Sequence, residues 1–137
     1  EFFIWAIQDS DSAPLQRLQI IKGFVDDGDL KEIVFDVACS DDLEVNQDNY
    51  RCPDNGAMVN IQDCSYDNSV GASELKTFWK DPTYKIGQRA FYYVRVLENP
   101  TCRWSTWDAI RNNVEPRSDY PTTIQERAWS SPIHLLP

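Results

Sequence analysis

The residues best suited to acid–base or nucleophilic chemistry are sparse in this sequence. His134 is the single histidine in 137 residues, and it lies beside Pro132, Ile133 and Leu135 in an apolar C-terminal segment. A catalytic histidine needs a nucleophile and an orienting acid within hydrogen-bond reach, and the surrounding segment supplies neither. We therefore expect His134 to be a structural or surface residue and the chain to be no enzyme.

The four cysteines form an even set without a C-x-x-C pair. Without that spacing, and with one histidine to join them, a structural zinc site is not expected. Two disulfides are favoured, four reduced thiols are the alternative, and disulfides predict an extracellular or cell-surface location. Of the three possible pairings we favour one pair that closes a polar loop and one that ties strands. These pairs are Cys39 with Cys52 and Cys64 with Cys102.

Short clusters of aspartates could supply oxygen ligands to Ca²⁺. They lie at positions 9 and 11, 26 to 29, and 41 and 42. None of them has the spacing of a complete calcium-binding loop, and aspartate also stabilises turns. We interpret the clusters as turn-forming and solvating residues, and we predict neither a metal nor a cofactor.

Three aromatic residues near the C-terminal third could form a platform on which a sugar ring stacks. They are Trp104, Trp107 and Tyr120. Exposed rings on the loops of a sandwich bind carbohydrate in this way, but the same rings could simply cover one end of the core. Thr122 and Thr123 are weak candidates for O-linked sugar attachment. Carbohydrate is therefore a candidate partner.

Short β-type runs separated by turn residues predict the secondary structure. Positions 89–98 are the clearest strand, because they are rich in aromatic and β-branched residues and two sets of side chains alternate along them. One set is Ala90, Tyr92, Val94 and Val96, and the other is Arg89, Phe91, Tyr93 and Arg95. Residues 40–56 are polar and predict a loop, and 99–123 predict a crossover with one helical turn at 107–112. The remaining predicted strands span 2–7, 18–25, 33–39, 57–66, 74–79, 124–129 and 133–136.

This pattern predicts an all-β fold, an antiparallel β-sandwich of jelly-roll or immunoglobulin-like type. Seven or eight short strands, no sustained helical period and no internal repeat all favour it. The sequence of positions 26–29, Asp-Asp-Gly-Asp, predicts a tight hairpin turn between two of the strands. At this length we expect residues 1–137 to form a single domain.

The charge of the chain argues against two classes of partner. Lys and Arg number 13 against 22 Asp and Glu, which gives a formal net charge of −9. Phosphate backbones and acidic membrane surfaces both need clustered basic residues. Apolar runs are only a few residues long, too short to span a bilayer. We expect no nucleic-acid binding and no membrane insertion.

The first strand is apolar on both faces, as a strand buried on both sides would be. Its residues are Phe2, Phe3, Ile4, Trp5, Ala6 and Ile7. An unpaired strand of this kind would expose backbone groups and large side chains, so it must join a sheet. If positions 9–14 act as a hinge, residues 1–8 could fill a neighbour's sheet. Repeated head to tail, that exchange produces a filament.

Six ordered motifs resemble the C-terminal region of the bacterial family called domain of unknown function 3604. The resemblance covers nearly the whole chain, with Cys39, Cys102 and the ending His134-Leu135-Leu136 as departures from the pattern. The motifs are IIKGFV at 20–25, VFDVA at 34–38, VGASEL at 70–75, RAFYYVRVLE at 89–98, RWSTWDA at 103–109 and QERAWSSPI at 125–133.

The resemblance implies a second function class. In longer family members this region follows a large domain similar to a metal-dependent phosphoesterase of the polymerase-and-histidinol-phosphatase type, and its His-rich motifs are absent here. The first hypothesis is a non-catalytic extracellular module that assembles with itself into a surface fibre by terminal-strand exchange. The alternative is the accessory C-terminal domain of such a hydrolase, whose catalytic domain is not in this chain.

Overall fold

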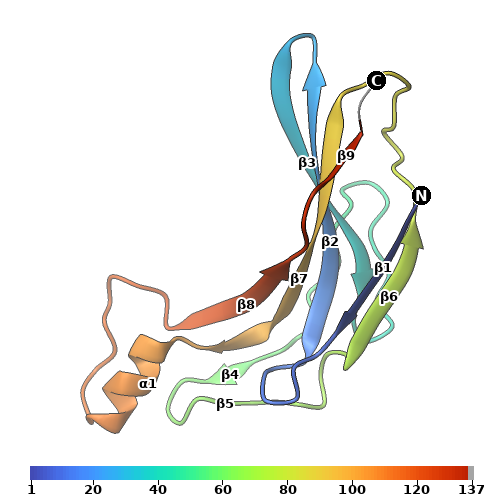
Figure 1. The fold of residues 1–137 in the computed structure, drawn as a ribbon. Coiled ribbons are helices and arrows are strands. Elements are labelled where there is room, and N and C mark those ends of the chain that lie inside the picture. The colour runs from blue at the N-terminus through green and yellow to red at the C-terminus, as the bar shows by residue number, and fades with distance from the viewer. Residues whose placement is uncertain (136–137) are drawn as a thin grey trace.

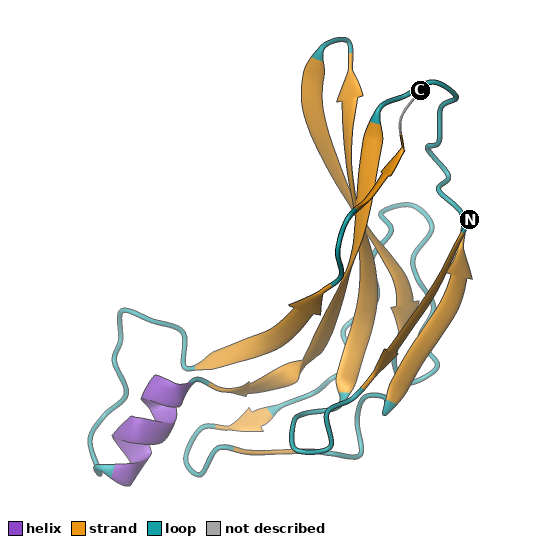
Figure 2. Cartoon of the chain, in the orientation of Figure 1, coloured by secondary structure: helices purple, strands orange, loops and turns teal. Residues whose placement is uncertain are grey.

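Nine strands and one short helix make up the chain in the computed structural model, which describes residues 1–135 (Figures 1 and 2). The elements are β1 (Phe2–Ile7), β2 (Leu15–Asp26), β3 (Asp29–Cys39), β4 (Val59–Asn60), β5 (Ser65–Tyr66), β6 (Glu74–Trp79), β7 (Ala90–Cys102), α1 (Trp104–Arg111), β8 (Thr123–Trp129) and β9 (Ile133–Leu135).

The predicted all-β antiparallel sandwich is confirmed. The larger sheet has the order β3-β2-β7-β8, with β9 also paired to β7, and the smaller sheet is the two-stranded ribbon β1-β6. All strand pairs are antiparallel. The far end of β7, the start of β8, α1 and the β4–β5 hairpin lie together at one end of the molecule (Figure 1). In the described part of the chain, no helix is long and apolar enough to cross a membrane.

Several predicted boundaries were wrong for local reasons. The strand expected at 57–66 is interrupted, because the Asp63 carboxylate accepts hydrogen bonds from Ser65 and holds a turn between β4 and β5. β7 continues past the expected end at 98 because a register shift before Pro100 accommodates that residue in the ladder with β8. The helix begins at Trp104 rather than at 107. Position 136 of the last predicted strand lies outside the described residues.

The predicted hairpin turn is confirmed between β2 and β3. Asp26 pairs with Asp29, and the two loop residues both have positive φ, 54° at Asp27 and 89° at Gly28. This backbone twist matches that of the flanking strands. The turn thus fixes the register of the longest hairpin in the sandwich.

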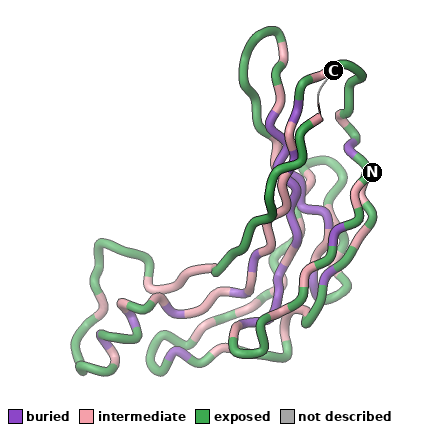
Figure 3. The backbone as a smooth tube through the Cα atoms, in the orientation of Figure 1, coloured by how far each residue is buried: buried purple, intermediate pink, exposed green. Residues whose placement is uncertain are grey.

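The core lies between the two sheets, where the buried positions concentrate in Figure 3. The ribbon contributes Ile4 and Leu75, and the larger sheet contributes apolar side chains that include Leu18, Ile20 and Phe35. Burial of each such side chain stabilises the fold by roughly 1.5–3 kcal/mol. The two-stranded ribbon is therefore held to the larger sheet by its inner face.

A buried ion pair joins the two sheets. Lys22 on β2 places its Nζ 2.6 Å from Oδ2 of Asp81, which lies just beyond β6, and both side chains are almost fully buried. Lys22 also donates to the carbonyl and the hydroxyl of Thr83, and the Tyr92 hydroxyl on β7 donates to Asp81 at 2.7 Å. Among the described residues, the hydrogen-bond and ion-pair partners of the cation come from the segment after β6, and the Phe24 and Tyr92 rings of the larger sheet also lie near it. The network therefore fixes where β6 ends.

The hydrogen bonds in this network outweigh desolvation at the carboxylate. Burial alone raises the pKa of Asp81, but hydrogen bonds from Lys22, Tyr92 and Thr83 together hold that pKa below its usual value. Burial, and then the hydrogen bond to Asp81, raises the pKa of Tyr92. The lowered pKa of Asp81 and the raised pKa of Tyr92 both favour a charged carboxylate beside a neutral phenol at neutral pH.

Two disulfides hold the irregular segments. Cys39 pairs with Cys52 across 13 residues and Cys64 pairs with Cys102 across 38, each with Cα atoms 5.6 Å apart. The first closes the polar loop after β3, and the second joins the β4–β5 hairpin to the end of β7. The structure therefore has the pairing favoured from sequence, and it contains no free cysteine.

A buried carboxylate reinforces the first of these loops. Asp36 on β3 accepts hydrogen bonds from the Cys52 backbone N–H at 2.8 Å and from the Gln19 amide at 2.6 Å. Arg51 lies 3.3 Å from the same carboxylate. The loop is thus held by a side chain of the sheet as well as by a covalent bond.

The Asp81→Asn variant should lose about 3 kcal/mol of unfolding free energy at neutral pH, because it leaves the Lys22 ammonium buried without its counter-charge. Since the pKa of folded Asp81 lies below the unfolded value of about 3.9, the contribution of the carboxylate is present above that pH and lost as pH falls through the folded pKa. The difference between wild type and variant should therefore shrink in acid. Urea unfolding at several pH values measures it.

The matched control is Asp119→Asn, which removes an exposed pair with Arg117. We expect the unfolding free energy of that variant to stay close to that of the wild type. An Asp81→Asn variant as stable as the control would contradict the role assigned to the buried pair.

All four cysteines should be unreactive toward a thiol reagent after denaturation without reductant. The loop-entropy relation predicts that replacing Cys64 and Cys102 by serine lowers the unfolding free energy by about 4 kcal/mol, and replacing Cys39 and Cys52 by about 3 kcal/mol. Thiol titration and denaturant unfolding of the two double variants test this. Four reactive thiols after denaturation of the purified native protein without reductant would contradict the presence of the two disulfides.

Candidate functional site

The outer face of the β1–β6 ribbon carries a group of exposed apolar side chains. Phe3, Trp5 and Ile7 on β1 are 57%, 57% and 67% exposed, and Phe78 on β6 is 71% exposed. Phe3 lies opposite Phe78 in the register, with ring centroids 4.8 Å apart. We call these four side chains the outer patch.

The prediction that β1 is buried on both faces is therefore wrong for one face. Successive side chains of a strand point to opposite sides. Ile4 is 4% exposed and Phe2 packs against the core on the inner side, whereas the odd-numbered residues face outward. The sandwich has two layers, and within residues 1–135 nothing lies over the outer side of the thinner one.

Polar groups at the edge of the outer patch fix the position of its central ring. The Trp5 indole N–H donates to Glu74 at 3.0 Å, and Lys76 lies 2.7 Å from the same carboxylate. Hydrogen bonds from Lys76 and then from Trp5 lower the pKa of Glu74. Sequence reasoning missed Phe78 as a member of this surface. The alternation of Glu74, Lys76 and Phe78 along β6 is the signal that could have revealed it.

A groove of about 530 Å³ runs beside β1 on the side away from β6. Phe2 and Ile4 line one wall, and Val94, Val96 and Ala128 on β7 and β8 line the other. It exists because the ribbon has two strands while the larger sheet beneath it has more, so part of the inner face of β7 and β8 is left uncovered. The groove and the outer patch share β1.

The structure separates the residues proposed to stack a sugar. Trp104 and Trp107 lie one turn apart on α1, and the Arg111 guanidinium covers the Trp107 ring at 5.5 Å. Tyr120 lies in the loop after the helix, under Arg117 at 5.0 Å. Among the described residues, no ring contact joins Tyr120 to either tryptophan.

The two threonines considered for sugar attachment help to anchor α1. The Thr122 carbonyl accepts hydrogen bonds from the Arg103 backbone and from the Thr106 hydroxyl, at 2.9 and 2.7 Å. Thr123 begins β8 and pairs with Cys102. Both threonines are half-buried. Their modification stays a prediction.

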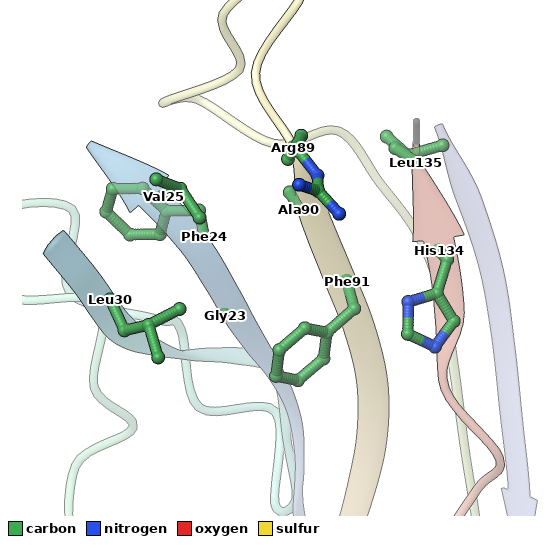
Figure 4. A pocket seen from close by; sticks show the side chains of 9 residues that line it. All are labelled: Gly23, Phe24, Val25, Leu30, Arg89, Ala90, Phe91, His134 and Leu135. Atoms are coloured by element: carbon green, nitrogen blue, oxygen red, sulfur yellow. The ribbon is translucent and has the colours of Figure 1, made fainter. Parts of the chain in front are cut away.

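His134 lies in a shallow pocket of about 290 Å³ on the opposite side of the larger sheet (Figure 4). It pairs with Phe91 across β9 and β7, with ring centroids 5.9 Å apart. The Phe91 ring covers Gly23, where an added Cβ would lie 2.3 Å from the ring. The residues lining the pocket include Arg89 but no serine, cysteine or carboxylate, so His134 has no nucleophile or orienting acid beside it there.

The aspartate clusters act as turn and loop residues. The Asp9 carboxylate accepts from the Asp11 N–H, and Asp26 pairs with two lysines. Asp41 accepts from Gly71 and Ser40, and these hydrogen bonds lower its pKa although burial alone raises it. In residues 1–135 no group of three or more potential ligands is arranged to hold a metal ion.

Comparison with known proteins gives one assignment. Neither the curated proteins nor the solved structures include a significant match to this sequence. A family model, by contrast, matches residues 1–137, the whole length of the chain. This result agrees with the six motifs, which lie in β2, β3, β6, β7, α1 and β8 and in the segments next to them. The chain belongs to the family described as protein of unknown function (DUF3604).

Proposed function

We propose that this chain is a non-catalytic accessory domain of a metal-dependent phosphoesterase-like hydrolase. The resemblance of the six motifs to the region that follows such a catalytic domain in longer family members supports this proposal, whereas the family description itself names no activity. The chemistry of a hydrolase would then lie in that other domain, and the sandwich would stabilise or position it.

The pairing of β1 is the observation that carries the proposal. β1 is hydrogen-bonded to β6 of its own chain over six residue pairs, and its Ile4 side chain lies in the core. A chain that completes its sandwich with its own first strand fits a self-contained domain. A fibre subunit that works by strand exchange must instead give up these contacts to a neighbour.

The two disulfides support an extracellular or cell-surface setting for the proposed hydrolase. They hold the polar loop and the β4–β5 hairpin, both of which lack a large apolar core of their own. Disulfides persist in oxidising compartments. A secreted or surface-anchored enzyme therefore suits the chain better than a cytoplasmic one.

The self-assembling surface fibre is a second candidate, and the outer patch favours it. An exchanged β1 could make the same contacts with the β6 of a neighbour. The exchanged strand would still expose Phe3, Trp5 and Ile7, and these side chains offer a surface on which subunits of the fibre could pack side by side. The segment between β1 and β2 contains the short turn that would have to open. In this case the chain itself would be the functional protein.

The purified 137-residue chain should hydrolyse no phosphomonoester, phosphodiester or sulfate ester, with or without added Mn²⁺ or Zn²⁺. The physical reason is that His134 lacks a nucleophile and an acid in its pocket. Chromogenic esters provide the assay, and His134→Ala is the control variant. Turnover that this substitution abolishes would contradict the proposal.

The intact mass of the native protein separates the two candidates. An accessory domain predicts a much longer product whose other region carries His-rich metal motifs, and removing residues 1–137 should reduce the thermal stability of that hydrolase. A mature product near 15.9 kDa would instead support the fibre.

A further inference from the structure

One edge of β1 has no neighbouring strand. β1 pairs with β6 on one side, and within residues 1–135 no strand pairs with its other side. The Gln8 N–H donates to the Ser73 carbonyl at 2.8 Å in the same register. Because hydrogen-bonded pairs alternate along an antiparallel ladder, Phe3, Trp5 and Ile7 direct their backbone N–H and C=O groups toward the open edge.

This edge lacks the features that normally keep sheet edges from associating. Soluble proteins place charges, prolines or bulges on open edges, and β1 has none of these between Phe2 and Ile7. Among the other strands at the edges of the two sheets, β3, β6 and β8 do carry charge, whereas the three-residue β9 does not. The charged residues of β3, β6 and β8 include Lys31 and Glu32, Glu74 and Lys76, and Glu126 and Arg127.

We propose that β1 pairs antiparallel with β1 of a second copy of this chain, centred on Trp5. In that register Trp5 lies opposite Trp5 of the second copy, and Phe3 lies opposite its Ile7. All three residues present their backbone groups to the open edge, so every pair is a hydrogen-bonded one. The sequence of β1 is thus self-complementary about Trp5, as a two-fold axis requires.

The apolar surface available is sufficient for such a contact. Phe3, Trp5 and Ile7 are more than half exposed, as are Trp129 and Ile133 beside the groove. Since a large side chain presents on the order of 150–250 Å², these five leave roughly 600 Å² exposed per copy. Edge pairing covers the flanks of these side chains that face the second copy, so the interface is small and fits a weak dimer whose population depends on concentration.

The groove makes the edge accessible. It separates β1 from β7 and β8 along Phe2, Ile4, Val96 and Ala128, so a second strand could approach without displacing a strand of this chain. The pairing keeps β1 on its own β6, unlike strand exchange, and it closes as a dimer. It does not depend on the proposed accessory role.

The first test is sedimentation of the purified chain over a wide range of concentration. We expect a reversible monomer–dimer equilibrium that added salt strengthens, because each copy carries a net charge of −9 and salt screens the repulsion. Ile7→Lys should raise the dimer dissociation constant by about tenfold or more, since it places a charge in the apolar pairing. It should leave the fold intact, because Glu74 lies opposite residue 7.

The matched control is Ile86→Lys, which adds the same charge at a loop position that is 93% exposed. We expect its dissociation constant to equal that of the wild type apart from the general charge effect. A chain that stays monomeric at every concentration and salt level, or equal weakening by both substitutions, would overturn the proposal. Filaments would overturn it as well, in favour of strand exchange.

The second test determines which residues of the two β1 strands lie opposite each other. Across the axis, Trp5→Cys should place two Cα atoms about 5.5 Å apart, within the range for a disulfide. Ile7→Cys should place them roughly 14 Å apart, four residues along the strand. Mild oxidation should therefore crosslink the first variant and not the second, with the linkage mapped by peptide mass spectrometry. Equal crosslinking of both would refute the Trp5-centred register.

Discussion

The position of the thin sheet depends on a buried charge. Removing the Lys22 ammonium from water costs several kcal/mol, and a nearby carboxylate with further hydrogen bonds must offset that cost. Asp81 and Thr83 provide those groups from the segment that follows β6. The end of β6 therefore has to lie against β2, and β6 in turn holds β1 through six paired residues. The buried ion pair thus fixes where β6 ends, and the apolar inner face of the ribbon packs on the larger sheet beside it.

The exposed outer face of the ribbon and the open edge of β1 follow from the position of the ribbon on the larger sheet. Only two strands cover the larger sheet, so the inner face is buried, the outer face is exposed and one edge of β1 is left open beside the groove. The strong inner packing of Ile4 and Leu75 keeps β1 in the ribbon. Exposed aromatic residues on such a well-held strand indicate a surface for contact rather than a strand that has failed to pack. The proposed accessory role and the proposed dimer both keep the sandwich intact.

The irregular segments of the chain are held by different means. Disulfides and buried hydrogen bonds hold the loop after β3 and the β4–β5 hairpin, and the Tyr50 ring also packs that loop against Phe35 in the core. Asp36 is fully buried beneath the first loop, and Cys102 ties the second disulfide to β7. A domain built in this way suits an oxidising exterior, and reduction would loosen the loops before the core. α1 lies at the end of the molecule away from the β1–β6 ribbon (Figure 1).

The sequence by itself determined the features that depend on neighbouring residues. Alternation predicted β7, the Asp-Asp-Gly-Asp turn predicted the β2–β3 hairpin, and loop closure favoured the observed pairing of Cys39 with Cys52. Tertiary structure alone decided which face of β1 is covered, because the side chains are apolar on both faces. The sandwich has two sheets, so only the face of β1 that packs on the larger sheet is buried. The partnership of Lys22 with Asp81 was likewise invisible in the sequence. It joins residues distant along the chain, and only the packing of two sheets brings their charges together.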